Sequence, residues 1–72
     1  MSESVNYKVS YVVLGRKHPG AVINMRRQPR VGDEVAFDGK VFRVLDVMEL
    51  MPALGDFGLL HATCQYLREQ KG

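Results

Sequence analysis

Apolar and polar residues alternate near the start of the chain, and this pattern restricts the fold more than any other feature of the sequence. Val5, Tyr7, Val9, Tyr11 and Val13 occupy every second position. A period of two places them on one face of a β-strand, and valine and tyrosine suit a pleated surface better than a helix. Residues 5–13 are therefore predicted to form a strand with one face on the core.

A second, weaker alternation runs over residues 21–27 and predicts a second strand. The segment between the two strands, residues 15–20, holds two glycines and a proline and is expected to be a loop. Pro29 ends the second strand, because proline cannot donate a hydrogen bond to a ladder.

The dipeptide Asp38-Gly39 predicts a tight hairpin, since a type I′ turn needs positive φ at both of its central residues. It joins a strand that ends at Phe37 to one expected over residues 40–48. The apolar residues of the later strand change phase after Val44, and a bulge near Leu45-Asp46 would reconcile them.

Residues 48–58 have no strand period and include a proline and two glycines, so a single helical or 3₁₀ turn within a loop is expected there. Residues 59–68 alternate again, with Leu60, Ala62, Cys64 and Tyr66 on one side. This pattern predicts a fifth strand, with a terminal helix as the alternative.

The predicted order is strand, loop, strand, strand, tight hairpin, strand, turn and strand, in one domain over residues 1–72. Short strands in so small a chain bury enough surface by curling into a barrel, which also removes unpaired edges. This all-β order resembles the SH3-like barrels, which have five strands and a 3₁₀ turn before the last. The OB-like barrel is the alternative, although its helix normally lies where this sequence has only Asp38-Gly39.

Composition and charge exclude several classes of protein. The single cysteine, Cys64, leaves no internal disulfide to form, and neither a signal peptide nor a membrane-spanning apolar run is present, so a cytoplasmic protein without membrane contact is expected. The charge is uneven: residues 1–30 hold six cations and Glu3, whereas residues 31–72 hold four cations and seven carboxylates. A basic surface for an acidic partner requires these cations to converge in space.

Neither a metal site nor a catalytic site is predicted, and no cofactor is expected. His18, His61 and Cys64 are the candidate metal ligands, but on an extended strand His61 and Cys64 point to opposite faces. Cys64 follows the apolar phase of its strand, which predicts a buried thiol rather than a nucleophile.

Two binding hypotheses remain, and the preferred one is a non-enzymatic interaction module that binds protein, as an adaptor or a homo-oligomer. Large apolar side chains crowd the segment after the fourth strand, where they either plug the barrel or form an interface. The interface residues would be Met48, Leu50, Met51, Leu54 and Phe57.

The alternative is a barrel that binds nucleic acid through its basic N-terminal half. Tyr7 or Tyr11 would stack on bases, although both tyrosines also fit the core phase of the first strand. The residues that would contact phosphates are Arg16, Lys17, Arg26, Arg27, Arg30, Lys40 and Arg43.

Overall fold

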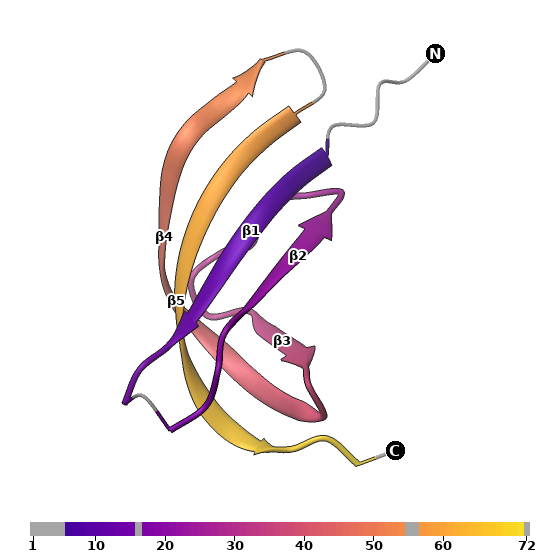
Figure 1. Ribbon diagram of the computed structural model, residues 1–72, viewed down its shortest axis with the longest axis vertical. Coiled ribbons are helices and arrows are strands. Elements are labelled where there is room, and N and C mark those ends of the chain that lie inside the picture. The colour runs from indigo at the N-terminus through magenta and orange to yellow at the C-terminus, as the bar shows by residue number, and fades with distance from the viewer. Residues whose placement is uncertain (1–5, 16, 55–56, 72) are drawn as a thin grey trace.

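Five strands form one mixed β-sheet (Figure 1). The computed structural model describes residues 6–15, 17–54 and 57–71, and for residues 52–54 it describes the backbone. The strands are β1 (Asn6–Val13), β2 (Ala21–Met25), β3 (Glu34–Phe37), β4 (Lys40–Leu54) and β5 (Phe57–Glu69). Their spatial order is β2-β1-β5-β4-β3, with β1 and β5 parallel and the other neighbours antiparallel. The all-β prediction is confirmed, and the described part of the chain contains no helix.

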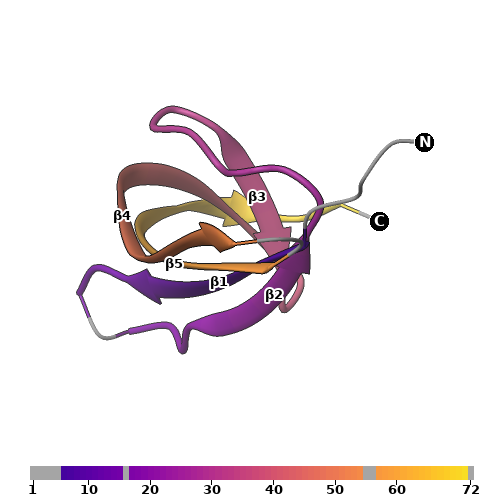
Figure 2. The ribbon, with the colours of Figure 1, turned by 90° about the horizontal axis from the view of Figure 1, so that it is seen from above.

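The sheet curls into a half-barrel instead of closing completely. Viewed from above, β4 and β5 form the back of an arc whose two ends are β2 and β3 (Figure 2). Leu45 is an extra residue on β4, because Val44 pairs with Cys64 and Asp46 pairs with Thr63. The bulge predicted near Leu45-Asp46 is confirmed, and bulges of this kind bend the strand that carries them.

The concave face of the half-barrel holds the core, and it collects alternate residues from three adjacent strands. The phases predicted for β1 and β5 are confirmed, because their in-phase apolar residues are the buried ones. The core residues are Val9, Tyr11, Val13, Phe42, Val44, Leu60, Ala62 and Cys64. Cys64 is fully buried as a small core residue, as its position in β5 predicts.

Aromatic side chains fill the part of this core that lies next to the hairpin between β3 and β4. Phe42 stacks on Phe37 with ring centroids 4.3 Å apart, and Tyr11 lies 5.6 Å from Phe37. His18, in the loop between β1 and β2, stacks on Tyr66 at 4.3 Å. The loop therefore covers one end of the concave face with a ring, which explains why His18 is only partly exposed.

The hairpin between β3 and β4 has the predicted turn. Asp38 and Gly39 have φ angles of 56° and 74°, which a type I′ turn requires at its two central positions. Glycine adopts this region without steric cost, and aspartate tolerates it better than most residues. The turn fixes the pairing of Phe37 with Lys40 and so sets the register of the hairpin.

The structure corrects one prediction and decides another. Residues 48–54 belong to β4, so the prediction of an irregular segment with a helical turn is wrong for these residues. Residues 55–56 lie outside the described part of the chain. Pairing of β4 with β5 overrides the missing strand period, and further register shifts at Leu50 and near Leu54 absorb the irregularity. Residues 59–68 are strand and not helix.

Candidate functional site

The far part of the hairpin between β4 and β5, past Val44, displays large apolar side chains. We call residues 45–54 and 57–61 the distal hairpin (Figure 1). Met48 and Leu50 are each 53% exposed, Met51 is 38% exposed and Phe57 is 39% exposed. These four side chains therefore do not plug the barrel, while the side chain of Leu54 lies outside the described part of the structure.

The outer edge of β4 is unpaired along the distal hairpin. β3 pairs with Lys40–Arg43 only. Two further hydrogen bonds extend this cover by one residue, since the Gly32 amide donates to the Val44 carbonyl at 2.8 Å and the Val44 amide donates to the Asp33 carbonyl at 2.8 Å. From Leu45 to Leu54 no described residue pairs with the outer edge, because the chain before Gly32 turns away towards β2.

This open edge, residues 45–54 of β4, is regular over Asp46–Glu49. These residues pair in unbroken register with β5, between the extra residues Leu45 and Leu50. Asp46 and Met48 lie on the convex face, because they pair with Thr63 and His61, whereas Val47 and Glu49 pair with residues of the concave face. The carboxylates of Asp46 and Glu49 are exposed, and among the described residues neither has an ion-pair partner.

The predicted phosphate-binding residues do not form one surface. Lys17 lies in the loop between β1 and β2, at the opposite end of that hairpin from Arg26 and the linker to β3 (Figure 1). Lys40 lies 3.9 Å from the Asp38 carboxylate, and Arg43 lies 3.4 Å from that of Glu34. The structure does not describe Arg16.

Arg43 is also part of a small network on the convex side. Arg68 donates to Glu34 at 2.8 Å and Arg43 donates to the other carboxylate oxygen at 3.4 Å. The hydrogen bond and charge of Arg68, followed by those of Arg43, hold the pKa of Glu34 below its ordinary value. The network joins β3, β4 and β5. Arg43 therefore helps to hold these strands together, and its charge is partly neutralised by Glu34.

The linker between β2 and β3 does bring three arginines close together in the chain, and two of them line one cavity. Arg27 and Arg30 share a polar cavity of about 280 Å³ with Gln28 and Asp33. The Asp33 carboxylate accepts a hydrogen bond of 2.9 Å from the Arg30 amide, which places an anion in the same cavity.

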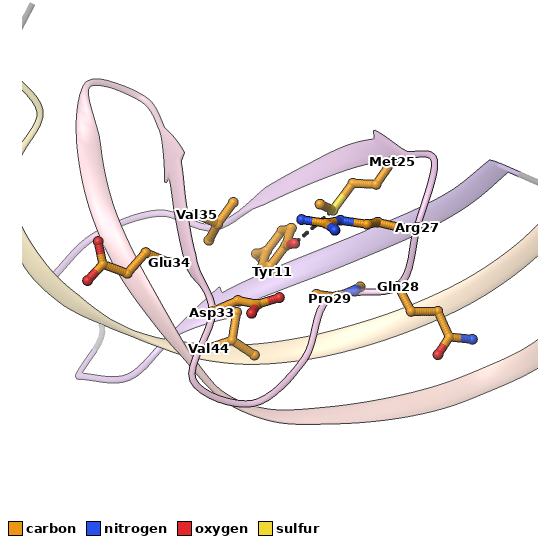
Figure 3. Close-up of a pocket in the computed structure, with 9 residues that line it drawn as sticks. All are labelled: Tyr11, Met25, Arg27, Gln28, Pro29, Asp33, Glu34, Val35 and Val44. Carbon is orange, nitrogen blue, oxygen red and sulfur yellow. Dashed lines mark hydrogen bonds between the residues drawn. The ribbon is translucent and has the colours of Figure 1, made fainter.

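A second cavity, of about 180 Å³, lies beside the first at the open side of the half-barrel (Figure 3). Tyr11, Met25 and Arg27 point into it from β1, β2 and the linker, while Gln28 points away (Figure 3). The Tyr11 hydroxyl donates a hydrogen bond to the Met25 sulfur at 2.9 Å. Pockets for drug-sized ligands usually enclose about 300–1,000 Å³, so this cavity is small for one.

Tyr11 is 1% exposed, so the position in the core that its phase in β1 predicts is confirmed, and the alternative role in base stacking is wrong. Its ring is enclosed by the curl of the sheet and by Phe37, so a base cannot reach its face. Tyr7 is half-buried and packs against the same core.

Burial of Tyr11 predicts a loss of stability at alkaline pH. Desolvation, followed by the charges of Cys64 and Asp33, raises the pKa of Tyr11 from 10.0 to about 12. The folded state holds the proton more tightly than the unfolded chain, so this contribution is complete below pH 10 and is lost as the pH rises to about 12. We expect the free energy of unfolding to fall by about 1–3 kcal/mol over this interval, as measured by denaturant titration. Tyr11→Phe should flatten the alkaline slope, and an unchanged slope in this variant would contradict the assignment.

The candidate metal ligands remain separate. His18 stacks on Tyr66, His61 lies on the convex face, and Cys64 is buried on the concave face. Within residues 6–15, 17–54 and 57–71, no three histidine, cysteine or carboxylate side chains are placed to hold a metal ion. Burial also raises the pKa of the Cys64 thiol, which keeps it protonated and unreactive at neutral pH.

Fold and site together define a small all-β half-barrel in which β4 has an unpaired outer edge and exposed apolar side chains. Across the described residues, no helix has the length and apolar character needed to cross a bilayer. Comparison with known proteins finds no match, whether among family models, curated proteins or solved structures.

Proposed function

We propose that this chain is a non-enzymatic interaction module of the SH3-like kind, and that it binds a protein partner in the cytoplasm through the distal hairpin. The observation that carries the proposal is the exposure of Met48 and Leu50, each 53%, on a strand whose outer edge is unpaired. Exposed apolar patches and unpaired strand edges both favour association, and methionine adapts to varied partner surfaces.

Nucleic-acid binding is the second candidate, and only the linker arginines favour it. Arg27 and Arg30 line one cavity, and Arg26 precedes them in the chain. Lys40 and Arg43 are drawn to carboxylates and Tyr11 is buried, so this surface is smaller than the sequence suggests. Salt-dependent binding of an oligonucleotide that is lost in the Arg26→Ala, Arg27→Ala double variant would favour this candidate.

The proposal predicts that Met48→Ser combined with Leu50→Ser abolishes association with protein partners while the fold survives. The matched control is Val22→Ser on β2, which replaces a side chain that is 63% exposed and lies outside the distal hairpin. Partners crosslinked to the wild-type protein in its source cells are identified and compared between the two variants. Thermal unfolding of both variants checks the fold, because exposed substitutions usually change stability by less than about 0.5 kcal/mol. Equal partner capture by both variants would contradict the proposal.

A further inference from the structure

We propose that the open edge of β4 binds an extended segment of its partner, rich in lysine or arginine and in aliphatic residues, as an added strand along Asp46–Glu49. This inference rests on the proposed function and adds the binding mode and the chemistry of the partner. An unpaired strand edge presents backbone N–H and C=O groups in register, and a peptide that adds to it gains main-chain hydrogen bonds.

The bulges determine the length of the added strand. Leu45 and Leu50 interrupt the pairing of β4 with β5, and a bulged residue also breaks the regular spacing of groups on the outer edge. The regular window between them is Asp46–Glu49. Native strand edges are often shortened in this way to prevent indiscriminate aggregation, so a short and selective contact fits this edge better than a long one.

The side chains of the window determine the chemistry of the partner. Each face of the sheet carries one carboxylate and one apolar residue, namely Asp46 and Met48 on the convex face and Val47 and Glu49 on the concave face. Cross-strand pairs of opposite charge and of aliphatic side chains are favourable. A partner strand therefore needs a cation and an aliphatic side chain on each face.

A second copy pairing through the same edge does not meet this requirement. A two-fold antiparallel pair keeps equivalent faces together, so its axis passes through Val47 or through Met48. Centring on Val47 places the two copies of Asp46 diagonally on one face, and centring on Met48 does the same to the two copies of Glu49. Like charges this close are unfavourable, and the window contains no cation to offset them.

The test uses the full chain and two blocked synthetic peptides of about six residues. One has the central sequence Lys-Val-Val-Lys and the other has Glu-Val-Val-Glu, so each face of the added strand carries one charge and one valine. We expect the lysine peptide alone to shift the backbone amide resonances of residues 45–49 and to slow their hydrogen exchange. Glu49→Lys should weaken its binding about 3- to 10-fold and Glu69→Lys, which makes the same change of charge outside the open edge, should leave it unchanged.

Three outcomes would overturn the inference. Equal binding of both peptides, or shifts outside residues 45–49, would refute the basic added strand. The proposed function would still stand in that case if the Met48→Ser, Leu50→Ser variant loses partner capture. Protection of residues 45–49 that depends on protein concentration, without peptide, would assign the edge to a second copy. Sensitivity of that self-association to Arg26→Glu would identify the basic end of β2 as the strand that docks.

Discussion

Replacing Phe42 with alanine is expected to lower the free energy of unfolding by about 3–5 kcal/mol, the largest effect of any prediction made for this protein. Phe42 is fully buried, stacks on Phe37 at 4.3 Å and meets Tyr66 edge-on at 5.9 Å. Its removal leaves a cavity that the curled sheet cannot close, because β3, β4 and β5 are held in register around it. Urea titration followed by circular dichroism measures the change.

Phe57→Ala is the matched control for this prediction. Phe57 is the same residue type but is 39% exposed on the distal hairpin, so its truncation is expected to cost less than about 1 kcal/mol. A domain of this size has a total stability of only about 4–10 kcal/mol, so Phe42→Ala removes much of it or unfolds the chain. Similar losses in the two variants would show that the concave face is not the core.

Gly20→Ala is expected to destabilise the protein by about 1–3 kcal/mol, even though Gly20 lies in an exposed loop. A Cβ atom at this position would collide with the backbone carbonyl oxygen of Tyr11 and lie 3.1 Å from its carbonyl carbon. Backbone within a paired strand cannot move aside as the end of a flexible side chain can. We therefore expect the melting temperature to fall by roughly 4–8 °C for each kcal/mol lost.

Asn24→Ala, an exposed change in the neighbouring strand β2, serves as the control and should alter stability by less than about 0.5 kcal/mol. A Gly20→Ala variant as stable as the wild type would mean that the backbone at Gly20 does not lie against the carbonyl group of Tyr11. Position 20 therefore requires glycine because there is no room for a Cβ atom, whereas position 39 favours glycine because its φ is 74°.

The free edge could not be read from the sequence, although one signal pointed towards it. The Asp38-Gly39 turn predicts a hairpin, but the strand before it is short, because Gly32 and Asp33 interrupt it soon after Pro29. β4 has 15 residues against the 4 of β3, so most of β4 has no partner on that side. The length of β4 was hidden by Pro52 and by the lack of a strand period after Val47.

The sequence by itself determined the local features whose physics is local. Alternation predicted which faces of β1 and β5 are buried, and the requirement for positive φ predicted the turn at Asp38-Gly39. The phase change after Val44 predicted the bulge at Leu45.

Only the tertiary structure decided what depends on contacts between distant segments. Parallel pairing of β1 with β5 and the incomplete curl of the sheet are set by packing across the whole chain. They leave β2 and β3 as the terminal strands, with the part of β4 beyond β3 unpaired on its outer side. Pairing with β5 also makes residues 48–54 part of a strand, although their sequence has no strand period. A period in the sequence reports which face of a strand is buried, whereas the neighbour of each edge is chosen by the fold as a whole.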